Sequence, residues 1–302
     1  MDGKELVYRL RNLLNESSDS AFLDSRTAYM FLWEAVKVFV SRTNYLKGTQ
    51  SITTVANQSD YTLNADFMKL YLKSENKEFL IKYNDGSDNT FLQWKDYDSI
   101  VYEDNTDSVS KPSFFTLLND TQDSIVTGTA SATGAVSNGV CTLSDTSSST
   151  KFADVSAGDI VHNTSDGADG IVLSKTSNTA IVTALFGGSG NDWTSGDAYI
   201  IQPQGRMKLM LSPPPLTAGH TITFYYVQIP PPVFSLYGIY SLPQQAMDAL
   251  VKYAAWLFKY RDRELDYGDK WYGYFERQMR NMASMLRDTQ DKNKLNVSFK
   301  KR

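Results

Sequence analysis

Residues 246–260 read AMDALVKYAAWLFKY, and twelve of these fifteen residues are apolar or aromatic. If the stretch is an α-helix, the exceptions Asp248, Lys252 and Lys259 share one stripe about 40° wide. Pro243 suits the first turn of such a helix, because the N–H group that proline lacks would be unpaired there anyway. A helix with so little polar surface must be covered on nearly every side. We expect neighbouring subunits to provide this cover; the alternative is that the stretch is the central helix of a monomer.

Two further helices are predicted near the N-terminus. Four leucines between residues 6 and 14 recur at helical spacing and form one apolar stripe. Asp24 or Ser25 can cap a second helix, which runs to about Tyr45. The polar residues of this second helix gather within about 80° of its circumference, so most of its surface is apolar and must be buried.

The C-terminal region continues the helical pattern and ends in a basic tail. Gly268 and Asp269 predict a break and a new helix cap, after which apolar residues follow on one face. Residues 287–302 carry six basic and two acidic residues without a core-forming pattern, and we interpret them as a tail that is disordered or docks on a partner. If subunits pack through these helices, the predicted contact residues are Leu250, Tyr253, Trp256, Leu257, Phe258, Trp271, Phe275 and Met279.

Runs rich in β-branched and aromatic residues predict strands between the helices. Thr221–Val227 is the strongest of them, because its residues favour a pleated, half-buried surface. Triple prolines at 213–215 and 230–232 bound it, since proline cannot donate a hydrogen bond to a strand ladder. The predicted strands are residues 49–56, 67–73, 78–83, 206–211 and 221–228.

Residues 124–202 differ in composition from the rest of the chain. They contain 24 serines and threonines, 10 of the 18 glycines and only four aromatic residues. Their formal charge is −5, whereas the other residues carry +1, so the net charge of −4 belongs to this segment. Short β-branched runs alternate here with turn residues, which predicts an inserted antiparallel sandwich or barrel with a core of its own. The predicted strands are residues 125–127, 139–143, 159–162, 170–173, 180–183 and 198–201.

These patterns together predict an α+β fold. It combines a helical layer of N-terminal and C-terminal helices, a small antiparallel β domain and an inserted β-sandwich or barrel module. The predicted domains are a helical ring-forming domain (1–47 and 241–290), a β domain (48–123 and 203–240), an inserted all-β domain (124–202) and a basic C-terminal tail (291–302).

Histidine and cysteine are scarce, which limits the chemistry that the chain can perform. The histidines are His162 and His220, and the one cysteine is Cys141. A zinc-binding cysteine cluster, an intrachain disulfide and a histidine-rich metal centre are therefore excluded. No nucleophile, zinc-protease or phosphate-loop motif is present. We expect no catalytic residue, no cofactor and no metal site, and hence a protein that is not an enzyme.

Two groups of carboxylates invite a functional interpretation. Asp166–Gly170 could suit calcium, but this stretch lacks the later bidentate glutamate of an EF-hand loop, and a hairpin turn explains it more simply. Glu264 and Asp266 could form a pair for glycoside hydrolysis. They lie, however, in a charged helix end, where solvated ion pairs are the expected role. We interpret both groups as structural.

Several short motifs follow one another along the chain. Residues 55–69 read VANQSDYTLNADFMK, and residues 241–254 read SLPQQAMDALVKYA. Between them lie KPSFF at 111–115, MLSPPP at 210–215 and the Tyr225–Tyr226 strand that leads into a proline. The motifs and their order resemble the adaptor, or head-to-tail connector, proteins of tailed bacteriophages.

The resemblance covers residues 1–122 and 203–290, with Asn64 standing where the family usually has a proline. Through residues 158–167 and 191–197, the remaining segment separately resembles small β modules grafted into phage virion proteins. Because the role of such modules varies, this second resemblance implies no function for the segment.

The first resemblance implies a structural virion protein, made in the host bacterial cytoplasm. Such adaptors form rings, as a rule dodecameric, that join the portal to the tail in the virion neck and extend and seal the DNA exit channel. The implied partners are other copies of the chain, the portal protein and tail or nozzle proteins, with DNA passing non-specifically and no membrane. We expect an uncharged or acidic lumen, along which DNA slides without sticking. The portal-docking residues expected in the tail are Lys294, Phe299, Lys300, Lys301 and Arg302.

Two other functions remain as alternatives. The chain could be a tail-associated binding module, an adhesin whose β segment holds a glycan or a capsid surface. Trp193, Tyr199 and Phe186 would then be the stacking groups, although packing in a core is the preferred interpretation. A cell-wall-degrading tail enzyme is the third reading. Deleting residues 124–202 distinguishes an adhesive role of the segment from an architectural one.

Overall fold

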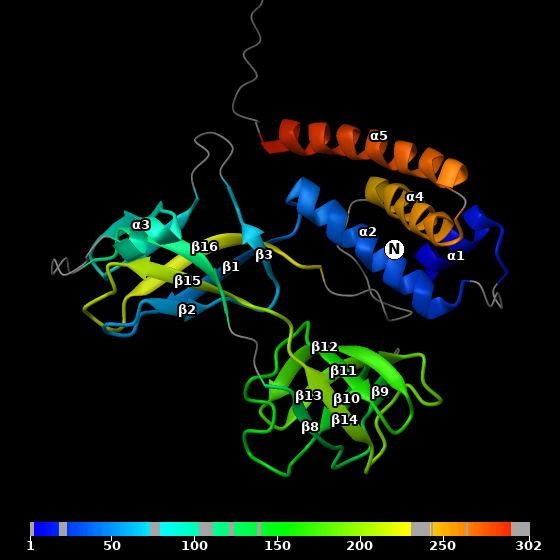
Figure 1. Ribbon diagram of the computed structural model, residues 1–302, viewed down its shortest axis with the longest axis horizontal. Helices are drawn as coiled ribbons and strands as arrows, with labels where there is room; N and C mark the ends of the chain where they lie inside the picture. The colour runs from blue at the N-terminus through cyan, green and yellow to red at the C-terminus, as the bar shows by residue number, and fades with distance from the viewer. Residues whose placement is uncertain are drawn as a thin grey trace, which may run out of the picture. The chain divides into compact units, whose positions relative to one another are not determined.

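The computed structural model shows a mixed α+β chain that divides into two compact units, residues 1–43 with 232–302 and residues 44–231 (Figure 1). The described residues form five helices and three sheets, so the predicted α+β class is confirmed. Among them, no helix combines the length and the hydropathy that crossing a lipid bilayer requires. The described residues are 3–17, 23–72, 79–102, 111–120, 124–137, 140–230, 242, 244–263 and 265–290.

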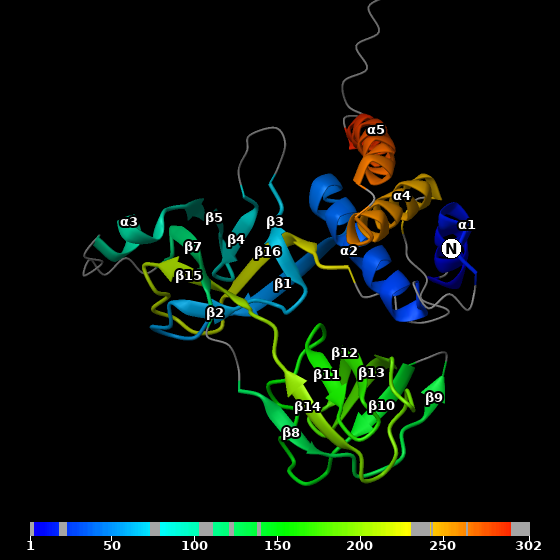
Figure 2. The ribbon, with the colours of Figure 1, turned by 45° about the vertical axis from the view of Figure 1, so that its right-hand side comes forward.

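The helices of the first unit are α1 (Gly3–Leu14), α2 (Ser25–Thr43), α4 (Gln244–Arg261) and α5 (Leu265–Gln290). Asp24 caps α2, because its Oδ1 accepts a hydrogen bond of 2.7 Å from the N–H of Thr27. The predicted leucine stripe of α1 is largely buried. Helices α1, α2 and α5 all contact α4 (Figure 2). Much of the apolar circumference of α4 is therefore covered within a single chain.

The turn between α4 and α5 lies earlier than the sequence predicts. α4 ends two residues before Arg263, which adopts a left-handed backbone conformation with a φ of 64°. The predicted break at Gly268 and Asp269 is wrong, because both residues lie inside α5. A Cβ at Gly268 would meet Cδ1 of Trp256 at 3.5 Å and Cβ of Lys259 at 3.4 Å. Both distances are ordinary van der Waals contacts, so Gly268 neither ends the helix nor is required by the packing of α5 on α4.

Two sheets of the second unit lie over one shared core. In the first sheet, β1 (Lys47–Thr53), β16 (Thr221–Gln228), β4 (Ile81–Asn84) and β5 (Asn89–Phe91) follow in this order, and β3 (Phe67–Leu70) also pairs with β16. In the second sheet, the order is β2 (Asp60–Thr62), β15 (Met207–Ser212), β7 (Phe114–Asn119) and β6 (Gln93–Trp94). The five strands predicted for this region are confirmed. The sequence did not predict β2, β5, β6, β7 or the short helix α3 (Tyr97–Tyr102).

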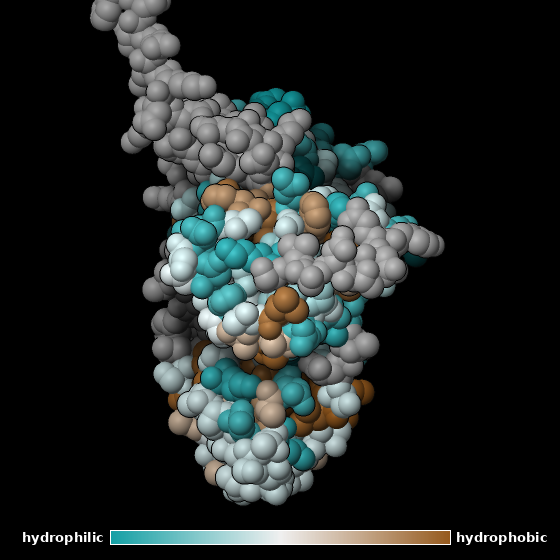
Figure 3. Space-filling model, turned by 90° about the vertical axis from the view of Figure 1, so that its left-hand side faces the viewer, coloured by the Kyte–Doolittle hydropathy of each residue, from teal (hydrophilic) through white to brown (hydrophobic). Residues whose placement is uncertain are grey.

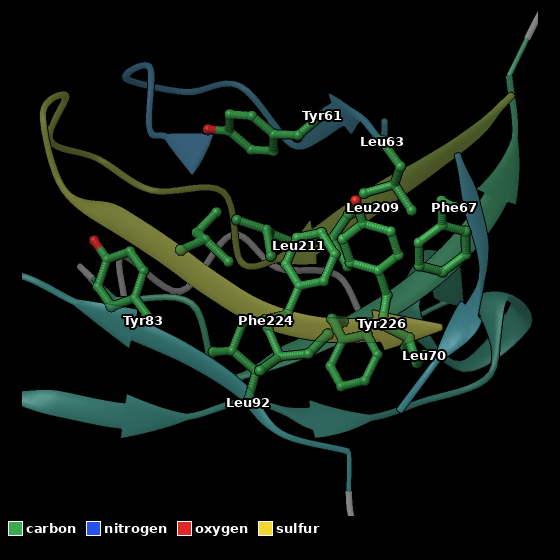
Figure 4. Packing of buried hydrophobic residues seen from close by; sticks show 13 residues of the cluster. Tyr61, Leu63, Phe67, Leu70, Tyr83, Leu92, Leu209, Leu211, Phe224 and Tyr226 are labelled. Carbon is green, nitrogen blue, oxygen red and sulfur yellow. The ribbon is translucent and has the colours of Figure 1, made fainter. Parts of the chain in front are cut away.

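Aromatic and aliphatic side chains from both sheets meet in this core (Figure 4). Phe224 and Tyr226 come from β16, Leu209 and Leu211 from β15, and each of the four is at most 2% exposed. The ring of Phe67 stacks on that of Tyr226 with 5.5 Å between the centroids. Burial of each such side chain contributes about 1.5–3 kcal/mol, so this cluster is a main source of the stability of the two sheets.

Residues 126–202 form the third sheet by themselves. Its strand order is β8-β14-β11-β12-β13-β10-β9, and all of its pairings are antiparallel. All six strands predicted here are confirmed, and a separate hydrophobic cluster packs between residues 126 and 201. The domain boundaries drawn from the sequence stay predictions. The strands are β8 (Val126–Thr129), β9 (Val136–Ser137), β10 (Val140–Ser144), β11 (Ile160–Asn163), β12 (Ala168–Ser177), β13 (Ala180–Phe186) and β14 (Ala198–Gln202).

Candidate interaction surface

Exposed hydrophobic side chains are distributed over much of the described surface. On the face shown in Figure 3, hydrophobic residues form several separate groups among hydrophilic ones. Single apolar side chains are normal on protein surfaces, so a functional surface has to be sought where several of them align. Helix α5, which packs against α4, carries such an alignment.

Aromatic rings pack between α4 and α5 and hold the two helices in register. The ring centroids of Tyr253 and Phe275 lie 4.8 Å apart, and those of Trp256 and Tyr272 lie 5.0 Å apart. Tyr253 is almost fully buried, and this burial raises the pKa of its hydroxyl. Aromatic pairs at such distances contribute about 0.5–1.5 kcal/mol beyond the area that they bury. The contact between the helices is therefore well fixed.

Arg42 of α2 connects this aromatic cluster to a carboxylate. Its Nη1 donates a hydrogen bond to Oε1 of Glu276, and its Nη2 donates one of 3.3 Å to the hydroxyl of Tyr272. The guanidinium also lies 5.6 Å from the ring centroid of Phe275. The hydrogen bond to Glu276 raises the pKa of Arg42, and the same bond lowers the pKa of the Glu276 carboxyl. A charged contact thus joins α2 to α5.

The contact between Arg42 and Glu276 makes stability depend on pH. Because the folded chain lowers the pKa of Glu276, the contact stabilises the fold above the ordinary glutamate pKa, and its contribution is lost as the pH falls through the lowered value. Glu276→Gln removes this loss. Since both side chains are partly exposed, we expect the wild type to lose only about 0.5–1 kcal/mol more than the variant on acidification. Urea unfolding at neutral and acidic pH measures the difference; equal losses in both proteins would contradict the assignment.

A second line of aromatic residues on α5 remains at the surface. Tyr267, Trp271 and Tyr274 follow one another at helical spacing, and we call them the aromatic stripe. Tyr267 and Tyr274 are 46% and 49% exposed, and the ring of Trp271 lies 6.0 Å from each of theirs. The ammonium groups of Lys259 and Lys252 on α4 lie 5.5 and 5.6 Å from the rings of Tyr267 and Tyr274. Tyr and Trp side chains are enriched at protein–protein contact sites.

Sequence reasoning named only one member of this stripe, Trp271. The signal for the other two was present, because Tyr267 and Tyr274 stand four residues before and three residues after it. It was missed because the neighbouring positions Phe275 and Met279 produce a stronger apolar pattern, and these two side chains are buried. α5 thus has a buried apolar face beside an exposed aromatic one.

The eight residues predicted at subunit contacts fall into two groups. Five are at most 9% exposed inside the helical unit, so packing within one chain accounts for their apolar character: Leu250, Tyr253, Phe258, Phe275 and Met279. Three keep partial exposure: Trp256, Leu257 and Trp271. A subunit contact at these residues stays a prediction. The predicted portal-docking residues lie outside the described residues: Lys294, Phe299, Lys300, Lys301 and Arg302.

Both histidines have partners within the β-sheets. Nδ1 of His162 lies 2.6 Å from Oδ1 of Asp169 on the adjacent strand, and Nδ1 of His220 lies 2.5 Å from the hydroxyl of Tyr83. Cys141 is a buried free thiol whose pKa is raised by its burial. Within the described part of the chain, no cluster of three or more His, Cys, Asp or Glu residues could hold a metal ion.

The carboxylate groups singled out in the sequence also have structural explanations. The hairpin turn predicted at Asp166–Gly170 is confirmed in part: the turn that joins β11 to β12 spans residues 164–167, and residues 168–170 already belong to β12. Asn163 organises it: its Oδ1 accepts a hydrogen bond from the N–H of Asp166, and its Nδ2 donates one of 3.0 Å to Asp197. Asp266 is exposed in the first turn of α5, and Glu264 lies outside the described residues.

Two stacking groups of the adhesin alternative lie in a core. Trp193 and Tyr199 are 0% and 1% exposed, so the preferred interpretation as core residues is confirmed. Nε1 of Trp193 donates a hydrogen bond of 2.8 Å to Oγ1 of Thr183, and the hydroxyl of Tyr199 donates one of 2.6 Å to Asp145. Burial raises the pKa of Tyr199 far above its usual value. Neither ring is available to a glycan; the side chain of Phe186 is outside the described part.

The fold is mixed α+β, and α5 carries an exposed aromatic stripe bordered by two lysines of α4. The family model described as SU10 adaptor protein matches residues 98–298, well over half of the chain. The chain belongs to the SU10 adaptor protein family and is thus a bacteriophage adaptor, a class that interacts with portal and tail proteins. The match runs through the seven-stranded sheet to the C-terminal helices, whereas the motif at 55–69 lies outside it. No curated protein matches the chain.

Proposed function

We propose that the chain forms the adaptor ring in the neck of a tailed bacteriophage. In this role it joins the portal to the tail and extends and seals the DNA exit channel. Membership in the adaptor family supports the general role, and resemblance to connector proteins suggests a ring of twelve copies. The role is structural and not catalytic, with the helical unit as a layer of the ring wall and residues 124–202 as an inserted β module.

The aromatic stripe is the observation that supports contact between copies. Tyr267, Trp271 and Tyr274 already pack against one another, so they lose little side-chain freedom when a neighbour covers them. Each aromatic side chain can bury about 150–250 Å². Lys252 and Lys259 border the stripe and suit a neighbouring surface that carries carboxylates. The stripe thus has both the apolar centre and the polar border of a protein interface.

Mass photometry of the purified chain mixed with portal tests the ring directly. We expect one large complex whose mass corresponds to portal plus a full set of adaptor copies. The chain alone can remain monomeric without contradicting the proposal, because assembly on a portal template is part of it. A chain that stays monomeric and unbound in the presence of portal would exclude the proposed role.

The basic tail carries a separate prediction. Removing residues 291–302 deletes Lys294, Phe299 and the final basic cluster, and we expect affinity for portal to fall by about tenfold or more. Lys300→Glu combined with Lys301→Glu reverses charge without shortening the chain and should weaken binding in the same direction. Affinity is measured by titrating labelled adaptor onto immobilised portal. Unchanged affinity of both variants would show that portal docking uses another surface.

A further inference from the structure

β1 is the longest edge strand among the described residues. It spans seven residues at one end of its sheet, whereas β2, β3, β5, β6, β8 and β9 have four residues or fewer. Edge strands expose unpaired backbone groups, and proteins usually keep them short or interrupt them with prolines, bulges or charges. β1 has no proline, its pairing with β16 shows no register shift, and its one charged residue is Lys47 at the first position.

The hydrogen bonds at the two ends of β1 show which backbone groups face outward. Leu46 accepts a hydrogen bond from the N–H of Gln228, and the N–H of Thr54 donates one to the carbonyl of His220. Both contacts fit one uninterrupted antiparallel register. The backbone N–H and C=O groups of the even-numbered residues of β1 therefore point toward β16. The N–H and C=O groups of the odd-numbered residues therefore point away from the sheet: Lys47, Thr49, Ser51 and Thr53. Within the described part of the chain, no strand pairs with this outer edge.

At the β2 edge of the other sheet, outward-facing backbone groups have hydrogen-bond partners, in contrast to those of β1. The N–H of Leu63, which follows β2, donates a hydrogen bond to the carbonyl of Met207 in β15. Because backbone groups alternate in direction along a strand, the carbonyl of Thr62 points outward from β2. The side chain of Gln50 on β1 reaches this edge. Its Nε2 donates a hydrogen bond of 3.4 Å to the carbonyl of Thr62, and its Oε1 accepts one of 3.0 Å from the N–H of Asn64. One side chain of β1 thus caps β2, whereas the backbone of β1 itself is left available.

We propose that the outer edge of β1 pairs with an extended segment of another virion protein, which adds a strand to the five-stranded sheet. Strand addition is a common mode of peptide recognition, with affinity from backbone hydrogen bonds and selectivity from alternate side chains. The proposal rests on the adaptor role for its choice of partner. It predicts a paired segment of β-branched, hydroxyl-bearing or aromatic residues, which fit the hydroxyl-rich outer face of β1 and β16.

Charge narrows the choice of segment. On the face formed by Thr49, Ser51, Thr53, Thr223 and Tyr225, the one ionic neighbour on β1 is Lys47. An uncharged or acidic segment is compatible with this face, whereas a basic one meets like charge. The chain's own residues 287–302, with six basic and two acidic side chains, have the wrong sign for it. The added strand is therefore not this basic tail, whether from the same chain or from a second copy.

Hydrogen exchange measured amide by amide gives a direct test. In the free chain, the N–H groups of Thr49 and Ser51 should exchange fast, and those of Gln50 and Ile52, which bond to β16, should exchange slowly. In necks isolated from virions, we expect exchange at Thr49 and Ser51 to slow by about tenfold or more, with little change at Gln50 and Ile52. Exchange at Thr49 and Ser51 that is equally fast in both states would overturn the proposal.

A pair of variants at one position separates edge pairing from side-chain effects. Thr49→Pro removes an outward N–H while keeping the ladder to β16, and Thr49→Val keeps the N–H and the shape of the side chain. Thermal unfolding controls for folding. We expect phage with Thr49→Pro to produce about tenfold fewer infectious particles than phage with Thr49→Val, with adaptor still bound to portal. Equal titres would contradict the proposal.

An electron cryomicroscopy map of the neck identifies the strand beside β1. A segment of another virion protein supports the proposal, and a segment of a second adaptor copy overturns it. Failure of the chain to bind portal in the mass photometry experiment contradicts the ring but leaves the exchange result on virions unaffected. The two proposals can therefore fail separately.

Discussion

Alanine at Trp271 should lower the affinity between adaptor copies by about 30- to 1000-fold, because truncating a central interface tryptophan costs about 2–4 kcal/mol. Trp271 is the middle ring of the aromatic stripe and lies 6.0 Å from both Tyr267 and Tyr274. Its removal opens the centre of the predicted contact and leaves the flanking rings without support. Assembly is measured by titrating adaptor onto portal and following the occupancy of complete rings by mass photometry.

A second variant distinguishes a loss of subunit contact from a loss of folding. Trp271 is only partly exposed, whereas Tyr267 and Tyr274 are 46% and 49% exposed, so Tyr267→Ala combined with Tyr274→Ala should leave the melting temperature nearly unchanged. We expect this double variant to reduce ring occupancy as well. Tyr8→Ala is the matched control, because Tyr8 is a 65% exposed aromatic residue on α1. Normal rings from both stripe variants, or an equal defect in the control, would refute the stripe as the contact.

Alanine at Trp193 should destabilise the seven-stranded sheet by about 3–5 kcal/mol. The indole is fully buried, its centroid lies 6.2 Å from that of Tyr199, and its Nε1 donates a hydrogen bond to Thr183. The substitution leaves a large cavity in a cluster drawn only from this sheet and its loops. Urea unfolding followed by circular dichroism should show an early transition in the variant, while the helical signal of α1, α2, α4 and α5 persists.

Tyr199→Phe provides a graded comparison in the same cluster. It keeps the ring but removes the hydroxyl, which donates a hydrogen bond of 2.6 Å to Oδ2 of the buried Asp145. Loss of a hydrogen bond to a charged group costs about 1.5–3 kcal/mol. The effect should therefore be smaller than that of Trp193→Ala. A Trp193→Ala protein within about 1 kcal/mol of the wild type would mean that the cluster does not hold this sheet together.

The strands that the sequence predicted are those with strong intrinsic signals. Thr221–Gln228 and residues 180–183 are rich in β-branched and aromatic residues, and both form strands in the structure. Asp60–Thr62 and Gln93–Trp94 were missed because strands of three and two residues carry no periodicity. They exist because β15 and β7 offer them partners, and such long-range pairing cannot be read from a local pattern.

The helices show a second limit of the sequence. The apolar circumference of residues 246–260 correctly indicated a covered helix, but apolar pattern does not distinguish cover by the same chain from cover by a neighbour. Leu250 and Phe258 are at most 1% exposed within one chain, whereas the exposed Tyr267 and Tyr274 did not stand out. Gly268 misled for a different reason: a glycine permits a helix end but does not require one, and this one lies inside α5.

The pairing of β1 with β16 has a mechanical consequence. The first segment of the helical unit ends at Thr43, and β1 starts four residues later. The second segment of that unit begins at Pro232, four residues after β16 ends. Both connections between the units therefore leave the same end of one strand pair. A force that pulls the units apart loads the hydrogen bond between Leu46 and Gln228 first and then opens the ladder one rung at a time. Such peeling needs far less force than sliding two strands past each other. A strand added to β1, as proposed above, would contribute further hydrogen bonds to the strand pair on which such a force acts.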